Sequence, residues 1–336
     1  MVDRKVTANR IVAAQTLLDS VQGFYVAEAL FQLLQAGVLS HLQKPHSSKE
    51  IADSLALCQK TLRDFLDFVS RCSDVIQVDK KGRYRLGAYP TETLYFQLEK
   101  FVGCYGPSIR GLANLLQGGK GNEPSQAALA RAFASVRAGN DLMISVLTRA
   151  QVFTLLDLGC GTGSLLVDMA MKNPRFEGYG FDSNRDMYTV GVTRVRKAGL
   201  TRRVHIKCAD ARKARKILGS KRAASIDALC GRSFLNQFFM NGGETVGKVL
   251  RALRRSFPGR NAWFVDYYGE LPARHNFEDS RLGLLQDACQ IVSGQGIPPA
   301  DRDQWRDIYR EAGCTLTDSE DFQSDGIRWF IHQVLL

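Results

Sequence analysis

Long apolar runs and closely paired cysteines are both missing from this sequence of 336 residues. No stretch of about 18 consecutive apolar residues occurs, so we expect no transmembrane helix. The first 15 residues contain no uninterrupted apolar segment, so we predict no secretory signal. The eight cysteines form no Cys-x-x-Cys pair, which argues against a zinc ribbon and against a disulfide framework. These absences predict a cytoplasmic protein with reduced thiols and no membrane partner.

Positive charge is abundant but concentrated in one part of the chain, whose net charge is +11. Residues 201–260 hold 15 Lys and Arg against 3 Asp and Glu, whereas the rest holds 30 against 31. Basic side chains can contact phosphates, but the densest stretch, 212–222, lacks interleaved aromatic residues that would stack on bases. We therefore expect a solvated helix face or a docking patch for an acidic carrier protein, rather than a nucleic-acid interface.

The first third of the sequence has the pattern of a winged helix. Apolar residues at helical spacing predict a helix over 9–40, and 47–72 predicts two short amphipathic helices, the first opened by Ser48. Two short β runs follow in 74–87. A winged helix often binds DNA, but the expected recognition region, 48–66, has only three basic residues, so we do not expect DNA binding here.

The domain prediction divides the chain into three parts. Residues 1–122 form a mainly α-helical winged-helix domain, and 123–150 form a helical linker. From about residue 152 helical and extended patterns alternate, which predicts a second, α/β domain over 151–336. Its expected strands are 152–158, 177–182, 203–210, 226–231, 262–268, 315–322 and 327–336. This predicts a Rossmann-like, doubly wound sheet of seven strands whose terminal pair forms an antiparallel edge.

A glycine-rich loop, "LLDLGCGTG", follows the first of these strands. In a dinucleotide loop the glycines are spaced G-x-G-x-x-G, but here Gly159, Gly161 and Gly163 alternate and the third comes one residue early. Asp157 would also repel a diphosphate, whereas it suits a ligand that carries an ammonium group. The loop therefore favours a cationic ligand over a nicotinamide dinucleotide.

Two further acids follow the next strands along the chain. Asp182 closes the second expected strand, where a carboxylate can accept hydrogen bonds from both hydroxyls of a ribose. Asp210 follows the third, in "CADARK", where it can accept from the exocyclic amine of adenine. Together with Asp157 they predict an adenosine without phosphates and with a cationic tail.

These three segments resemble motifs I, II and III of the class I S-adenosylmethionine-dependent methyltransferases, over residues 150–336. The resemblance implies S-adenosylmethionine as cofactor and S-adenosylhomocysteine as product. The cofactor-binding residues that it implies are Asp157, Gly159, Gly161, Gly163, Asp182, Ser183, Asp210, Ala211 and Ser233.

The N-terminal part resembles the dimerisation domain of small-molecule O-methyltransferases. The resemblance implies a homodimer formed through this domain, whose helices also help to line the substrate pocket. By this analogy Tyr25, Tyr105 and Arg110 are candidates to reach the active site.

The acceptor site departs from the plant-type O-methyltransferases, which carry a His-Asp pair after the fourth strand. That His serves as the base that a protonated nucleophile needs. Here Asn236 and Gln237 occupy these positions. An amide cannot take a proton, although it can orient or polarise a carbonyl group. The departure weakens the interpretation as an ordinary phenol O-methyltransferase.

Residues 282–316 and 325–336 resemble bacterial methyltransferases that methylate C3 of 2-oxo acids, such as phenylpyruvate and 2-ketoarginine methyltransferases. We therefore predict a small-molecule methyltransferase of natural-product biosynthesis, with C3 of a 2-oxo acid as one acceptor. The alternatives are O- or N-methylation of another metabolite and, less favoured, methylation of a nucleic acid. Arg328 and Trp329 could bind the oxo-acid carboxylate.

Some members of that group hold a metal through histidine. Of the five histidines here only His275 lies in a plausible pocket loop, where it is a candidate base or ligand. One His beside amides makes a poor metal site, so no metal is predicted. Gln286 and Asp287 are expected to face the pocket, and Asp266 is expected to have a structural role.

Overall fold

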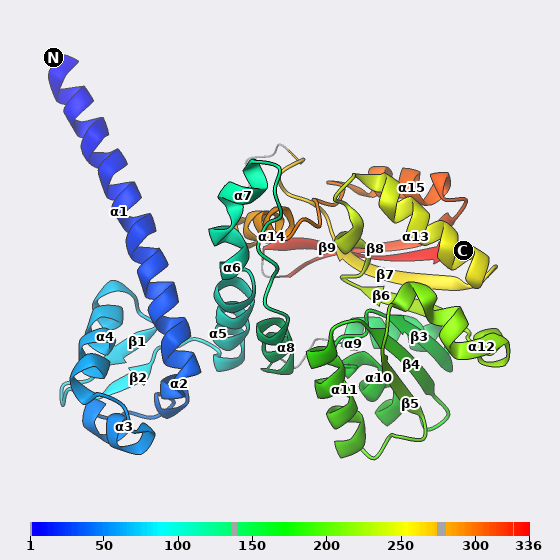
Figure 1. Cartoon of the computed structure of the whole chain (residues 1–336), viewed down its shortest axis with the longest axis horizontal. Coiled ribbons are helices and arrows are strands. Elements are labelled where there is room, and N and C mark those ends of the chain that lie inside the picture. Colours follow the sequence, from blue (N-terminus) through cyan, green and yellow to red (C-terminus); the bar gives the residue numbers. More distant parts are fainter. Residues whose placement is uncertain (1, 136–139, 274–279, 325) are drawn as a thin grey trace. The chain divides into compact units, whose positions relative to one another are not determined.

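Figure 1 shows the computed structural model of the chain, which describes residues 2–135, 140–273, 280–324 and 326–336. The chain divides into two compact units, Met1–Gly103 and Cys104–Leu336. The predicted first domain extended to residue 122, but 104–122 lie in the second unit, where Ser125 N donates to Cys104 O at 3.0 Å. The predicted linker corresponds to two helices of that same unit. No helix in the described ranges is long and apolar enough to cross a membrane.

The first unit has the predicted order of helices and hairpin. The short strands β1 and β2 pair antiparallel, with Gln77 opposite Arg85. Leu39, Ile51 and Leu66 are fully buried, so the helices pack around one apolar core. The elements are α1 (Val2–Gln35), α2 (Val38–His41), α3 (Ser48–Leu55), α4 (Gln59–Cys72), β1 (Ile76–Val78), β2 (Tyr84–Leu86), α5 (Thr91–Gln97) and the π-helix η1 (Leu98–Cys104).

The start of α3 corrects one detail of the sequence prediction. Ser47, and not Ser48, caps the helix: its Oγ accepts from Glu50 N at 3.2 Å, and Ser47 N donates to the Glu50 carboxylate at 2.7 Å. Ser48 is the first helical residue, and it is buried. Both serines precede the apolar pattern, and only the reciprocal bond to Glu50 distinguishes the cap.

The second unit contains the predicted seven-stranded sheet, in the order β5-β4-β3-β6-β7-β9-β8. β5, β4, β3, β6 and β7 run parallel, and β9 runs antiparallel to both β7 and β8, so the antiparallel edge is confirmed. The strands are β3 (Thr154–Leu158), β4 (Glu177–Asp182), β5 (Val204–Cys208), β6 (Ala228–Arg232), β7 (Asn261–Tyr267), β8 (Thr315–Ser324) and β9 (Ile327–Leu335).

Helices cover both faces of this sheet (Figure 1). The longer ones are α8 (Gln126–Ser135), α9 (Asp141–Arg149), α10 (Ser164–Lys172), α11 (Arg185–Lys197), α12 (Ala214–Ala224), α13 (Gly243–Ser256), α14 (Arg281–Val292) and α15 (Arg302–Glu311). Shorter ones are α6 (Gly106–Arg110), α7 (Leu112–Leu116), η2 (Ala211–Lys213) and η3 (Leu235–Phe238). Because the central strands are buried on both faces, they read as continuous apolar runs, as in "TLLDL".

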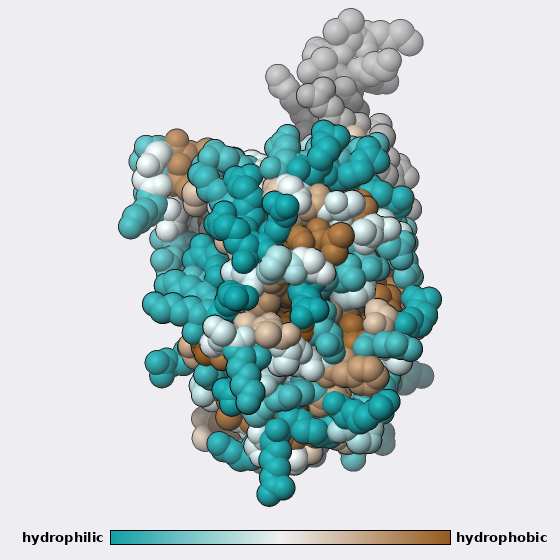
Figure 2. Space-filling view, turned by 90° about the vertical axis from the view of Figure 1, so that its right-hand side faces the viewer, coloured by the Kyte–Doolittle hydropathy of each residue, from teal (hydrophilic) through white to brown (hydrophobic). Residues whose placement is uncertain are grey.

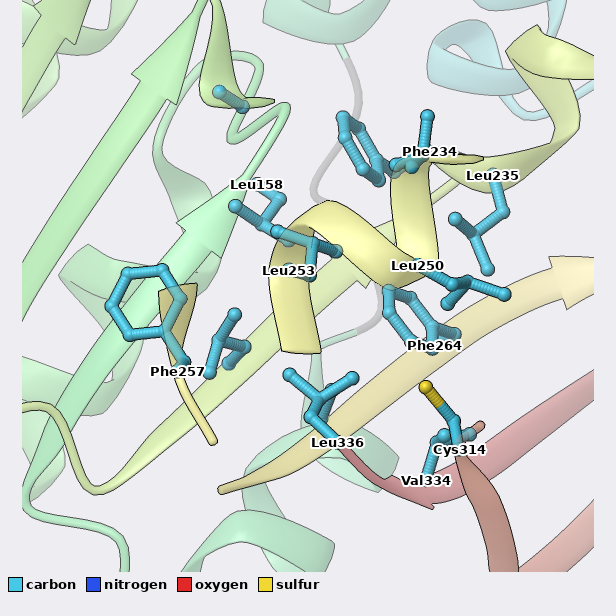
Figure 3. Packing of buried hydrophobic residues seen from close by; sticks show 14 of the residues in the cluster. Leu158, Phe234, Leu235, Leu250, Leu253, Phe257, Phe264, Cys314, Val334 and Leu336 are labelled. Carbon is cyan, nitrogen blue, oxygen red and sulfur yellow. The ribbon is translucent and has the colours of Figure 1, made fainter. Parts of the chain in front are cut away.

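Two apolar clusters hold the helices to the two faces of the sheet. Figure 3 shows part of one of them, in which Leu250 of α13 packs with Phe264 of β7 and Val334 of β9. The other contains Leu155 of β3 and Leu165 of α10. The surface seen in Figure 2 is mainly hydrophilic, with hydrophobic residues scattered between. This packing fixes the carboxyl ends of the parallel strands β3, β4 and β6 at one edge, where the loops of the site begin.

Candidate functional site

The glycine loop joins β3 to α10 in a backbone conformation that residues with a side chain rarely adopt. Gly159, Gly161 and Gly163 have φ of +66°, +54° and +65°, in the left-handed region. A Cβ on Gly163 would also collide with the side chain of Ile206. Gly159 N and Cys160 N both donate to Phe181 O of β4, at 2.9 and 3.1 Å. The loop is thus held close to the neighbouring strand.

Asp182, at the end of β4, fixes this loop further. Its Oδ2 accepts from Gly161 N and its Oδ1 from Asn184 N, both at 2.8 Å. Burial raises the pKa of Asp182, and the two backbone bonds lower it. Each carboxylate oxygen keeps a free lone pair, so the side chain can still accept from the two hydroxyls of a ribose. Ser183 is exposed beside it.

Asp157 is the most deeply buried acid of the site, with 1% of its surface exposed. Neither carboxylate oxygen has a hydrogen-bond partner among the described residues. Burial raises the pKa of Asp157 to about 7, nearby Arg232 lowers it, and Asp182 raises it. A buried carboxylate without partners is costly, so its place in the fold points to a ligand that donates to it.

Arg232, which the sequence analysis did not select, lies on the same face of the sheet. Asp157 is opposite Cys230 in the register of β3 and β6, and Arg232 comes two residues later on β6. Its guanidinium donates to Asn140 Oδ1 and, at 3.5 Å, to Ser164 Oγ, while its Nε is buried and has no partner within the described ranges. An arginine at the end of an apolar strand, "ALCGR", was the available signal.

These groups fit S-adenosylmethionine. Its methionine part carries an ammonium, which matches Asp157, and a carboxylate, which matches the Nε–H of Arg232. One zwitterion therefore provides partners for the Asp157 carboxylate and for Arg232 Nε, which have none among the described residues. The two ribose hydroxyls of the same ligand match the two carboxylate oxygens of Asp182 as hydrogen-bond donors.

The third acid, Asp210, is already engaged. Arg212 Nε donates to Oδ1 and Arg212 Nη2 to Oδ2, both at 2.9 Å, and Arg212 lowers the pKa of Asp210. Asp210 also caps η2, which begins at the buried Ala211. The expected contact with adenine thus shares this carboxylate with Arg212. The Arg212 guanidinium lies 5.6 Å from the ring centre of Phe238, over its face.

The turn after β6 separates the two amides of the predicted acceptor site. Ser233 has a φ of +48°, and its N donates to Val265 O at 2.8 Å. Gln237 is exposed, and its Nε2 donates to Ser233 O at 2.9 Å. Asn236 is buried, and its backbone N donates to Asp266 Oδ2 at 2.9 Å. Of the two amides, only Asn236 is therefore held in the interior, while Gln237 supports the turn.

Asp266 of β7 and Asp287 of α14 accept hydrogen bonds from neighbouring protein groups. Asp266 accepts from Asn236 N and Tyr267 N, and burial raises its pKa to about 7. Asp287 accepts from Tyr267 Oη at 2.9 Å and from Glu270 N at 2.8 Å. Gln286, beside it on α14, is buried.

The remaining candidates lie on different elements of the two units. Tyr25 lies on α1 of the first unit with 60% of its surface exposed, and Arg110 lies on α6 of the second unit. Tyr105, just before α6, is buried. His275 lies outside the described residues. Arg328, expected to bind a substrate carboxylate, instead forms an ion pair with the buried Glu270 at 2.9 Å.

The described part of the chain contains no set of side chains suited to bind a metal ion. No group of three or more His, Cys, Asp and Glu residues there is arranged to hold a metal ion. His332 is buried between the hydroxyl groups of Tyr268 and Tyr309, and burial lowers its pKa to about 3. This histidine is part of the core.

The sheet order, the glycine loop and the acids at the strand ends together define the class I methyltransferase fold. Residues 155–256 match a family model described as a methyltransferase domain. The second unit therefore contains a methyltransferase domain, and the predicted enzyme class and its cofactor, S-adenosylmethionine, are confirmed at this level. Among curated proteins, none matches this chain.

Several solved structures share the fold over nearly the whole chain. The mitomycin 7-O-methyltransferase MmcR has a TM-score of 0.70 and 16% identity, covering 98% of this chain and 99% of its own. PigF with S-adenosylhomocysteine (SAH) has a TM-score of 0.68 and 16% identity, covering 95% and 99%. The N,N-8-amino-8-demethyl-D-riboflavin dimethyltransferase RosA from Streptomyces davawensis has 0.60 and 17%, covering 96% and 99%. At these identities the likeness shows the fold.

Proposed function

We propose that this protein transfers a methyl group from S-adenosylmethionine to an oxygen or nitrogen atom of a small organic molecule. The observation that carries the proposal is Asp157, a buried carboxylate without partners among the described residues, with Arg232 on the same sheet face. S-adenosylmethionine supplies an electrophilic methyl group at this edge. The protein aligns the nucleophile with it and excludes water.

The acceptor class is supported by the proteins that share the fold. MmcR is a mitomycin 7-O-methyltransferase, and RosA is an N,N-dimethyltransferase of 8-amino-8-demethyl-D-riboflavin. Both acceptors are small molecules, and natural-product biosynthesis is the setting that we propose for this chain too.

Methylation of C3 of a 2-oxo acid remains a prediction from the resemblance of residues 282–316 and 325–336. The pairing of Arg328 with Glu270 does not favour it, because the guanidinium already has a carboxylate partner. Formation of a homodimer through the first unit and docking of an acidic carrier protein on residues 212–222 also remain proposals.

The test uses the purified full chain and two measurements. Isothermal titration calorimetry with SAH asks whether the cofactor site exists. Mass spectrometry after incubation with methyl-labelled S-adenosylmethionine and a panel of phenols, catechols, amines and 2-oxo acids, with and without chelator, then identifies the methylated atom. We expect SAH binding and label on oxygen or nitrogen. Absence of SAH binding would reject the proposed function.

A further inference from the structure

Three buried amide side chains form a network beside the proposed acceptor site. Gln290, on α14, lies at its centre with 1% of its surface exposed. In the orientation that satisfies both ends of this amide, Gln290 Oε1 accepts from Asn236 Nδ2 and from Gln286 Nε2, each at 3.2 Å. Gln290 Nε2 donates to Asn236 O at 3.0 Å and to Gly296 O at 3.2 Å. Gln290 therefore fixes which end of each neighbouring amide faces it.

The network leaves two hydrogen-bond acceptors without donors. Asn236 and Gln286 both direct an NH₂ group to Gln290, so their carbonyl oxygens face elsewhere. Asn236 Oδ1 and Gln286 Oε1 are buried, and neither has a partner within the described ranges. A buried acceptor that has lost its water is costly unless it is satisfied. Two of them on one network indicate a ligand with N–H or O–H groups.

The network lies at the edge of the sheet where the cofactor loop is placed. Asn236 follows Arg232 of β6 by four residues, and a Cβ on Gly159 would lie 3.2 Å from Phe234, two residues before Asn236. The backbone of Asn236 is held by Asp266 at the end of β7. Through Phe234, the turn that contains Asn236 therefore contacts the loop that would hold the methyl donor.

Amide oxygens accept hydrogen bonds but do not take protons at neutral pH, which limits the chemistry. A hydroxyl nucleophile loses its proton in the reaction and needs a base for it. A neutral amine attacks with its lone pair and keeps its hydrogens until the new bond exists. Positive charge then develops on the N–H groups, where carbonyl oxygens stabilise it.

We propose that the methyl acceptor is an amine whose N–H groups donate to Asn236 Oδ1 and Gln286 Oε1. This inference rests on the proposed function, since it names the acceptor of the same site. The nitrogen lone pair forms the N–C bond as the C–S bond of the donor breaks and its electron pair goes to sulfur. The methylated ammonium then loses one proton to solvent, which leaves the N-methylamine.

Matched pairs that differ only in an amino or a hydroxyl group test this proposal. The probes are 4-aminobenzoate and 4-hydroxybenzoate, 5-aminoindole and 5-hydroxyindole, 6-aminoquinoline and 6-hydroxyquinoline, and phenylpyruvate for the carbon alternative. The full chain is incubated with ¹³C-methyl-labelled S-adenosylmethionine, and NMR locates the label. We expect label on the amino nitrogen and none on the matched hydroxyl compounds. Label on an oxygen or on C3 of phenylpyruvate overturns the proposal.

Two variants separate recognition of the amine from folding. Gln286→Met keeps the side-chain length but removes the orphan oxygen, and we expect kcat/KM for the amine to fall roughly 10-fold or more. Asn236→Asp supplies a carboxylate that can take a proton, so transfer to the hydroxyl compound should appear. SAH affinity should remain that of the wild type in both, and Gln323→Met, on exposed β8, is the matched control.

The outcomes distinguish this proposal from the proposed function. If Gln286→Met methylates the amine as fast as the wild type, the amide oxygen does not bind it and the inference is wrong. If the wild type binds SAH but labels oxygen or carbon, the function stands and only the amine assignment fails. If SAH does not bind at all, both fail.

Discussion

At the scale of single residues, the site depends most on a buried carboxylate, Asp157, and on the buried Nε of the half-buried Arg232. Asp157 and Arg232 lie two positions apart in the register of adjacent strands, yet the Asp157 oxygens and Arg232 Nε have no protein partner in the described part of the chain. Desolvation of such groups opposes folding, so it must be offset by another interaction, such as the binding of a ligand. A zwitterionic ligand satisfies both.

Removal of the Asp157 carboxylate tests its part in this pair. Because burial raises its pKa to about 7, Asp157 is mostly protonated at pH 6 and mostly ionised at pH 8. The ionised form binds an ammonium, so the affinity for SAH should rise roughly 10-fold between pH 6 and pH 8. Asp157→Asn should bind SAH more weakly and lose this pH dependence in calorimetry. The exposed Asp318→Asn should retain it.

The same pKa has the opposite consequence for the stability of the ligand-free protein. A carboxyl whose pKa is raised in the folded state binds its proton more tightly there than in the unfolded chain, whose pKa is about 3.9. Asp157 thus contributes stability at low pH that is lost as the pH rises from about 4 through about 7. Urea unfolding of Asp157→Asn should show a smaller decline over this range. An equal decline in both proteins contradicts the assignment.

Arg232 is tested by comparing two ligands. SAH has the amino-acid end and 5′-methylthioadenosine lacks it. We expect Arg232→Met to weaken SAH binding by about 10-fold or more, because a charge-assisted hydrogen bond is lost, while 5′-methylthioadenosine binding stays the same. An equal loss for both ligands would mean that the substitution disturbs the loop as a whole.

At the scale of elements, short turns of the backbone determine which side chains can contact a ligand. Arg212 follows Asp210 closely enough in η2 to bind both of its oxygens, which a sequence pattern of acids at strand ends does not reveal. The positive φ of Ser233 turns the chain so that Asn236 is buried and Gln237 is exposed. Two adjacent amides thus receive different environments from one turn.

The cap of α3 gives a prediction for the first unit. Ser47→Ala removes the acceptor for Glu50 N and should lower the free energy of unfolding by about 1 kcal/mol, measured by urea denaturation. Ser47→Asp keeps a side-chain acceptor and should restore most of the loss. Ser48→Ala should not reproduce the effect of Ser47→Ala, since Ser48 makes no cap.

At the scale of the whole molecule, α1 leaves apolar side chains uncovered. Leu17, Val21 and Phe24 are 67%, 45% and 52% exposed, at spacings that place them along one side of the helix. Large apolar residues gathered in this way mark an interaction surface. This agrees with the proposed homodimer through the first unit.

Charge on this surface should prevent the association. We expect the wild type to sediment as a dimer and Val21→Glu/Phe24→Glu to sediment as a monomer with unchanged circular dichroism. Lys44→Glu, on the same unit but outside α1, is the control and should remain dimeric. A wild type that is monomeric over the whole concentration range would reject the dimer.

The sheet and the cofactor loop are predictable from the sequence alone. Their signals are local: continuous apolar runs mark strands covered on both faces, and the glycines of "GCGTG" stand where the backbone needs positive φ. Asp157 and Asp182 were found because acids at strand ends meet at one edge of a parallel sheet. The order of helices and hairpin in the first unit is predictable because its apolar periodicity is also a local signal.

Which side chains lack hydrogen-bond partners depends instead on contacts between distant parts of the sequence. The proposed roles of Arg232, Gln286 and Gln290 depend on neighbours that are far away in sequence. Arg232 lies near Asp157 and bonds to Asn140, and the two glutamines form a network with Asn236. The same holds for Arg328, whose partner is Glu270, 58 residues away. Hydrogen bonding and desolvation depend on three-dimensional contacts, which periodicity and spacing along the chain do not specify.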